Sequence, residues 1–236
     1  MYNINNKILE LSNEFGLTLT EDRIFKFNQY YNLLISWNEK MNLTAITDIE
    51  GIVKKHFIDS MSIAKYFSID NQAKLLDIGT GAGFPGIPLK IIREDLKITL
   101  LESLTKRAVF LRELCDELGI EAEIINERAE DAAHKVCFRQ KFDYVVSRAV
   151  AKLNVMCEYV LPFLKVGGYF IAMKGPNVEE EANASLNALK VIGGDLMDTV
   201  SFDLFGNCRT LVIIRKDKET SDKYPRSFSK IKSCPL

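Results

Sequence analysis

Two overlapping glycine patterns occupy the stretch LLDIGTGAGFPG, residues 75–86. Gly81, Gly83 and Gly86 match the spacing G-x-G-x-x-G, which is typical of loops that hold the pyrophosphate of a dinucleotide. Asp77 begins a second pattern, D-x-G-x-G-x-G, which belongs to a ligand of the opposite charge. Both kinds of loop follow the first strand of a doubly wound sheet, so the glycines alone indicate a nucleoside ligand without choosing between the two.

The carboxylate of Asp77 distinguishes these ligands. A pyrophosphate is anionic and binds backbone N–H groups at a helix N-terminus, where a neighbouring carboxylate is unfavourable. S-adenosylmethionine carries an ammonium and a sulfonium group, which attract a carboxylate at the mouth of the loop. We therefore expect S-adenosylmethionine as the cofactor, bound by Asp77, Gly79 and Gly81. Glu102 ends the next expected strand, where a carboxylate accepts hydrogen bonds from ribose hydroxyls of either nucleoside.

The surrounding elements predict an α/β fold. Apolar residues at helical spacing predict a helical N-terminal extension over residues 1–67, with Thr47 capping its third helix. Over residues 68–215, five short β-rich segments alternate with helical patterns, which predicts parallel strands with helices on both faces. Two more strands flank Gly206-Asn207, a hairpin signal. The expected sheet is therefore mixed and seven-stranded.

Composition and charge exclude several classes of protein. The 236 residues carry a net charge of −1, which excludes a strongly basic nucleic-acid-binding protein. No stretch approaches the ~20 apolar residues of a membrane span, and the N-terminus lacks the pattern of a signal peptide. The five cysteines are scattered and form no CxxC pair, and there are only two histidines. We expect no metal site and a cytoplasmic location.

A basic segment ends the chain, taken here as residues 216–236. From Arg215 onward seven basic residues outnumber three acidic ones, a balance of +4 against −5 for the rest of the chain. One interpretation is a contact with RNA phosphates, in which the guanidinium of Arg226 holds a phosphate through two hydrogen bonds. The competing interpretation is that Tyr224-Pro225-Arg226 packs the terminus onto the sheet.

Eight segments occur in the order found in one bacterial enzyme family. They are KMNLTAIT, VKKHFIDS, LLDIGTGAGFPGIPL, ESLTKRAVFL, ERAED, VVSRAVAKL, MKGP and KYPR. From about Tyr30 to Arg226 the chain resembles the small-subunit ribosomal RNA guanine-N7 methyltransferase family RsmG, also called glucose-inhibited division protein B. The resemblance implies a class I, Rossmann-like methyltransferase fold with a C-terminal antiparallel hairpin. It also implies methylation of N7 of one guanine in 16S ribosomal RNA, as naked RNA or in a small-subunit particle.

The resemblance implies roles for particular residues. Gly79 and Phe84 in the loop, Ala129-Glu130 after the third strand and Arg148 after the fourth are implied to bind the cofactor. Arg148 is also a candidate for positioning the substrate. After KYPR, the ending SFSKIKSCPL departs from the Gly- and Pro-rich residues usual in the family.

Contacts with the RNA are harder to assign. The candidates are Asn42, His56, Lys174 and Arg226. His56 and Asp59 share one face of a helix, so they either anchor the extension to the main domain or form a wall of the RNA or cofactor site.

The implied reaction requires positioning rather than a base. Guanine N7 has a free lone pair and no proton, so we name no catalytic base. After the fourth expected strand the chain reads Ser147-Arg148-Ala149 and lacks the Asn/Asp-Pro-Pro-Tyr segment that binds exocyclic amines. Three alternatives stay open: a small-molecule methyltransferase, an NAD-dependent oxidoreductase and a non-catalytic RNA- or nucleoside-binding protein.

Overall fold

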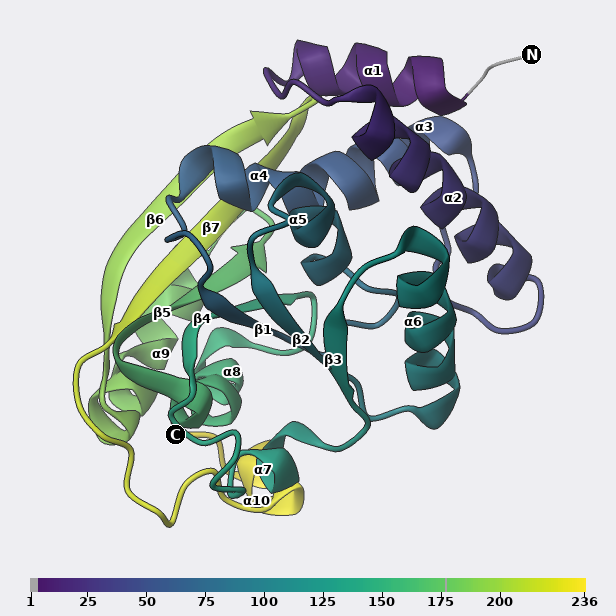
Figure 1. Cartoon of the computed structure of the whole chain (residues 1–236). Coiled ribbons are helices and arrows are strands. Elements are labelled where there is room, and N and C mark those ends of the chain that lie inside the picture. Colours follow the sequence, from purple (N-terminus) through teal and green to yellow (C-terminus); the bar gives the residue numbers. More distant parts are fainter. Residues whose placement is uncertain (1–3, 177) are drawn as a thin grey trace.

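The computed structural model describes residues 4–176 and 178–236, and its centre is a seven-stranded sheet (Figure 1). The strands are β1 (Lys74–Ile78), β2 (Lys97–Leu101), β3 (Ala122–Ile125), β4 (Phe142–Arg148), β5 (Leu164–Lys174), β6 (Gly194–Leu204) and β7 (Asn207–Lys216). Their order is β3-β2-β1-β4-β5-β7-β6, in which β1 to β5 are parallel and β7 pairs antiparallel with β5 and β6. The predicted mixed sheet with a closing hairpin is confirmed.

The topology fixes where a ligand binds. β1 pairs with both β2 and β4, so the strand order reverses on either side of it. In open α/β sheets the crevice at such a switch point, outside the carboxyl ends of the strands, holds the ligand. Gly79, Glu102 and Arg148 lie at the carboxyl ends of β1, β2 and β4.

Helices cover both faces of the sheet. They are α1 (Ile4–Glu14), α2 (Glu21–Asn38), α3 (Ile49–Ile52), the π-helix η1 (Val53–Ile58), α4 (Asp59–Tyr66), α5 (Gly86–Ile92), α6 (Thr105–Leu118), α7 (Ala129–Ala132), α8 (Leu153–Val160), the short η2 (Leu161–Phe163), α9 (Glu179–Ile192) and α10 (Phe228–Ser233). One core cluster joins α1 to α6 with one face of the sheet, and a second joins α7 to α10 with the other. Within the described ranges, no helix is long and apolar enough to cross a membrane.

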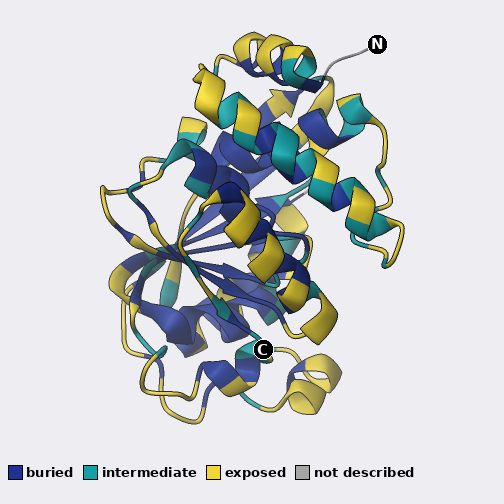
Figure 2. Cartoon of the chain, turned by 45° about the vertical axis from the view of Figure 1, so that its right-hand side comes forward, coloured by how far each residue is buried: buried dark blue, intermediate teal, exposed yellow. Residues whose placement is uncertain are grey.

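The N-terminal helices share their core with the sheet. Ile8 of α1, Phe27 of α2 and Phe57 of η1 are fully buried in the same cluster as Leu75 of β1. In Figure 2 the exposed residues of α1 and α2 lie on their outer sides and the buried residues face inward. Residues 1–3 of the predicted helical segment lie outside the described residues. The helical extension therefore completes one layer of the α/β domain.

The predicted cap of α3 and the predicted hairpin turn are each displaced by one residue from their positions in the structure. Asp48, rather than Thr47, caps α3, because its Oδ1 accepts the N–H of Gly51 at 2.7 Å. The hairpin between β6 and β7 turns at Phe205-Gly206 rather than at Gly206-Asn207, since both turn residues have positive φ, 52° and 80°. A two-residue turn of this kind matches the twist of the flanking strands.

Candidate active site

The loop after β1 needs a glycine at its first position. Gly79 has φ +67°, and a Cβ there would lie 2.8 Å from Cγ2 of Val150, in the segment after β4. A side chain would therefore be strained and would also meet the neighbouring loop. The N-terminal extension braces the same loop, because the hydroxyl of Tyr30, fully buried in α2, donates to the carbonyl oxygen of Ala82.

A polar cavity of about 560 Å³ opens beside this loop at the carboxyl ends of the strands. Its lining includes six residues from distant parts of the chain: His56, Gly79, Gly81, Phe84, Glu102 and Arg148. All six were singled out from the sequence, and the fold brings them together at the switch point.

An apolar cavity of about 530 Å³ adjoins the polar one. Ile78, Ala129 and Val155 contribute apolar surface to it, and Glu130 contributes a carboxylate. Gly79 and two further residues line both cavities, so the two form one site. An apolar half beside a polar half suits a ligand with an adenine at one end and a zwitterionic amino acid at the other, as S-adenosylmethionine has.

Glu102 is placed as expected. Its Oε2 accepts the N–H of Gly81 at 3.0 Å and its Oε1 the N–H of Leu104 at 2.8 Å. These two bonds fix the carboxylate on the wall of the polar cavity, and an ionised carboxylate has further acceptor positions for ribose hydroxyls.

Asp77 does not face the cavity, which corrects our expectation that it meets the cationic ligand. Its carboxylate is fully buried, and Oδ2 accepts the hydroxyl of Thr80 at 2.7 Å and the N–H of Gly86 at 2.8 Å. Burial raises the pKa of Asp77 to about 7, although the bonds from Thr80 and Gly86 oppose that rise. The side chain of Asp77 therefore connects the start of the glycine loop, at Thr80, with its end, at Gly86, and does so on the side away from the cavity.

The Ala129-Glu130 pair stands at the start of α7 and lines the apolar cavity. Oε1 of Glu130 accepts Nε of Arg128 at 2.6 Å, which orients a mostly buried carboxylate at the cavity wall. The pair therefore combines apolar surface with a hydrogen-bond acceptor at one wall of the apolar cavity.

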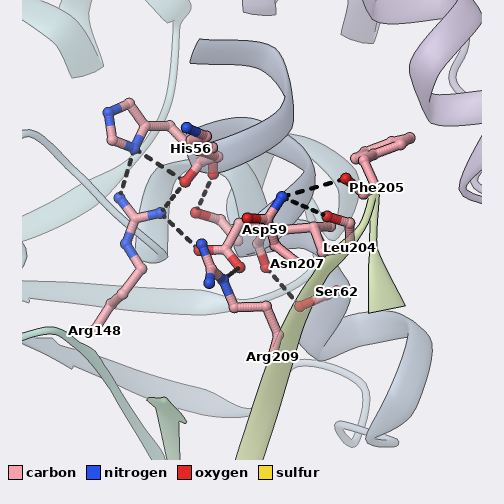
Figure 3. A network of polar contacts seen from close by, with 10 residues as sticks. His56, Asp59, Ser62, Arg148, Leu204, Phe205, Asn207 and Arg209 are labelled. Carbon is pink, nitrogen blue, oxygen red and sulfur yellow. Dashed lines mark hydrogen bonds and ion pairs between the residues drawn. The ribbon is translucent and has the colours of Figure 1, made fainter. Parts of the chain in front are cut away.

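Arg148 is fixed by a network that crosses from the sheet to the extension (Figure 3). One terminal nitrogen donates to Oδ2 of Asp59 at 3.1 Å and to the carbonyl oxygen of Lys55, and the other contacts Nδ1 of His56 at 3.2 Å. Oδ1 of Asp59 accepts Nε of Arg209 at 3.1 Å. The ring of Phe84 packs against both His56 and Arg148, with its centre 4.7 Å from the centre of the histidine ring and 4.8 Å from the guanidinium carbon. Asp59 thus anchors the extension and positions a residue of the site.

The same surroundings keep His56 neutral. Nε2 of His56 lies 2.7 Å from Oγ1 of Thr44, and Nδ1 lies 3.2 Å from a guanidinium nitrogen of Arg148 and 3.1 Å from the carbonyl oxygen of Lys55. Burial, and then the charge of Arg148, lower the pKa of His56 to about 3. The imidazole is therefore neutral near pH 7, and both of its ring nitrogens lie within hydrogen-bond distance of protein groups.

Comparison with known proteins identifies the family. The model of the family described as rRNA small subunit methyltransferase G matches residues 23–210. The chain belongs to this family. It is 49% identical over 227 residues to the Ribosomal RNA small subunit methyltransferase G of Clostridium botulinum (strain Loch Maree), covering 95% of each chain. It is 47% identical over 232 residues to the protein of that name from Thermoanaerobacter sp. (strain X514), covering 97% of each.

Solved structures share the fold at low sequence identity. M. jannaschii TYW2, crystallised in complex with AdoMet, has a TM-score of 0.56 at 15% identity, over 73% of this chain and 79% of that one. A SAM dependent methyltransferase from Aquifex aeolicus has a TM-score of 0.54 at 18% identity, over 77% of this chain and 98% of that one. The class I fold is confirmed by this likeness. Family membership confirms the expected S-adenosylmethionine-dependent methyltransferase of small-subunit ribosomal RNA.

Two of the residues expected to contact RNA are engaged within the protein. Nζ of Lys174 binds the carbonyl oxygen of Ala151, at 2.8 Å, and the carboxylate of Glu181, so it holds the loop after β4 instead of facing a substrate. Nε and Nη2 of Arg226 bind the two oxygens of Glu158 at 2.8 and 2.7 Å. Glu158 is only 1% exposed, so a buried carboxylate holds Arg226, and the interpretation that this guanidinium holds an RNA phosphate is corrected.

The other two candidates keep a place near the cavity. His56 lines it, although its nitrogens are engaged as described. Asn42 is exposed in the loop between α2 and α3, next to Leu43, which lines the polar cavity. Over residues 4–176 and 178–236, no group of three or more His, Cys, Asp or Glu side chains is arranged to hold a metal ion.

Sequence reasoning missed three residues that shape the site. Arg209 reaches Asp59 from 150 positions away, Thr44 orients His56, and Phe228 lines the apolar cavity. Only Thr44 had a local signal, because it belongs to the segment KMNLTAIT. The other two contacts depend on the tertiary fold.

Proposed function

We propose that this chain transfers the methyl group of S-adenosylmethionine to N7 of one guanine in 16S ribosomal RNA by direct in-line displacement, without a general base. The observation that carries this proposal is the state of His56. It is the histidine that lines the polar cavity, its pKa of about 3 keeps the imidazole neutral, and both of its ring nitrogens contact protein groups. An acceptor that has no proton to lose, such as guanine N7, suits this site.

Different residues of the site bind different parts of the cofactor. Glu130 accepts from the adenine amino group, Glu102 accepts from the ribose hydroxyls, and the Gly79–Ala82 turn borders the methionine end. S-adenosylmethionine supplies the activated methyl group. The contribution of the protein is to hold the guanine so that N7 lies in line with that methyl group.

Arg148 is the residue we propose for orienting the guanine. Three of its five N–H donors are engaged with Lys55, Asp59 and His56, which leaves two for an oxygen acceptor. Guanine O6 is such an acceptor, next to N7, and N7 must itself stay free for the methyl group. The ring of Phe84 below the guanidinium keeps it flat against the cavity wall.

The rate of methyl transfer is expected to be nearly independent of pH. With both substrates saturating, the single-turnover rate should change less than about twofold between about pH 7.5 and about pH 9, because neither N7 nor His56 exchanges a proton there. The measurement is rapid-quench transfer of a labelled methyl group. A tenfold rise over that range, lost in His56→Gln, would show that a base acts on a different target atom.

The substrate form and location are further parts of the proposal. We propose that the protein acts in the cytoplasm on 16S RNA, free or within a small-subunit particle, with Asn42 at the rim of the cavity as a contact for the RNA. A small-molecule methyltransferase is the alternative. It would methylate free guanosine as efficiently as the RNA, so comparing kcat/KM for the two separates the proposals.

A further inference from the structure

The last nine residues of the chain border the apolar cavity. Phe228 and Lys232 of α10 and Pro235 after it line this cavity together with Ala129 and Glu130 of α7. In Figure 1, α10 lies beside α7, below the carboxyl end of β3. A segment at the C-terminus therefore closes a space whose other walls come from the core of the methyltransferase fold.

Hydrogen bonds fix the segment that leads into α10, residues 220–226. Arg139 donates to the carbonyl oxygens of Thr220 at 2.8 Å and Tyr224 at 2.9 Å, and Glu158 holds both the guanidinium and the backbone N–H of Arg226. Ile231 of α10 is fully buried in the core cluster on that face. The helix is thus docked through Ile231, and this contact does not use Phe228.

Phe228 is 44% exposed, and it lines the apolar cavity together with Arg128 and Glu130. The guanidinium carbon of Arg128 lies 4.2 Å from the centre of its ring. The same Arg128 binds Glu130, the proposed acceptor for the adenine amino group. An aromatic ring, a guanidinium and a carboxylate are therefore linked along one wall of an apolar space.

We propose that α10 is part of the cofactor site, in which Phe228 covers the adenine of S-adenosylmethionine. This inference rests on the proposed function, since it assigns a wall to the adenine end of the same cofactor. A purine offers a flat apolar face, and an aromatic side chain that borders its pocket buries that face on binding. The ring of Phe228 is 44% exposed at the border of the cavity, so a purine stacked on it would remove apolar surface from water.

The test is calorimetric titration of S-adenosylmethionine and of 5′-methylthioadenosine, which keeps the adenosine and lacks the amino-acid end. Phe228→Ala should weaken both ligands by about tenfold, the usual scale of an aromatic contact with a base. Phe228→Tyr should restore both affinities to within about twofold, because it keeps the ring. Phe25→Ala is the matched control: Phe25 is 59% exposed on α2, does not line this cavity, and should leave both affinities unchanged.

Three outcomes would contradict the inference. Affinities of Phe228→Ala within about twofold of the wild type for both ligands would remove Phe228 from the site. A loss confined to S-adenosylmethionine would place Phe228 at the amino-acid end instead. Absence of binding to the wild-type protein would overturn the proposed function together with this inference. Melting curves check that the variants are folded, which we expect because Ile231, and not Phe228, docks the helix.

Discussion

Replacing Asp77 by alanine is expected to weaken S-adenosylmethionine binding by at least about tenfold and to lower the free energy of unfolding by about 2 kcal/mol. The carboxylate accepts the N–H of Gly86 and the hydroxyl of Thr80, so alanine leaves buried donors without their acceptor. The loop from Gly79 to Ala82 lines the polar cavity and would lose its support. Calorimetric titration and urea unfolding measure the two effects.

Asp77→Asn separates support of the loop from direct attraction to the ligand. The amide oxygen can still accept from Gly86 and Thr80, so cofactor affinity should stay within about threefold of the wild type. If Asp77 acted through its negative charge on the sulfonium, asparagine and alanine would weaken binding alike. Equal losses in two folded variants would contradict the structural role.

The stability of the wild type and that of Asp77→Asn should also depend differently on pH. The pKa of Asp77 is about 7 in the folded state against an ordinary value of 3.8, so the folded protein binds more protons between these values. The contribution of this group to stability is therefore complete below about pH 4 and is lost as the pH rises through about 7. Asp77→Asn should remove that loss, which makes its stability curve flatter than that of the wild type over this range.

Asp59→Ala is expected to lower the free energy of unfolding by about 2–3 kcal/mol and to reduce methylation more than 100-fold (~2.7 kcal/mol). Asp59 is buried and pairs with Arg148 and Arg209, so alanine leaves two cations without their shared partner. Arg148 would then lose its ion-pair partner among the three groups that hold it beside Phe84. Urea unfolding and single-turnover methylation are the measurements.

Arg209→Ala is the matched control for this network. It removes the other cation on Asp59 but leaves the bond from Arg148 to Asp59 in place, and Arg209 does not line the polar cavity. Stability should fall by about 1 kcal/mol, and methylation should stay within about threefold of the wild type. If Arg209→Ala were as inactive as Asp59→Ala, the network would act through overall stability and not through the position of Arg148.

The sequence predicted those features that depend on residues close together along the chain. The glycine loop, the alternation of strands and helices and the acid at the end of β2 are local signals, and the fold places them at one site. The side-chain direction of Asp77 was not readable, because helices cover both faces of the sheet and β1 after Lys74 is buried on both sides. An alternating pattern, which would have shown the direction, is absent from such a strand.

The sequence also could not predict which side chains pair when the two partners are far apart along the chain. The basic count of the tail indicated a phosphate contact, whereas Arg226 pairs with Glu158, 68 positions earlier on α8. Lys216, which we placed at the start of the basic segment, instead ends β7. Its ammonium donates to the carbonyl oxygen of Leu161 at 2.7 Å, and burial lowers its pKa to about 7. Net charge describes the composition of a segment, but only the fold decides which of its charges face solvent.

The most direct test of the proposed function is the identity of the methylated nucleoside. Small-subunit particles and free 16S RNA that lack the modification are incubated with the protein and S-adenosylmethionine carrying a labelled methyl group, then digested to nucleosides and separated. We expect the label in 7-methylguanosine, with at most one methyl group per RNA molecule in at least one of the two substrates. Label in another nucleoside, or transfer to neither substrate by a protein that binds the cofactor, would contradict guanine-N7 methylation of 16S ribosomal RNA.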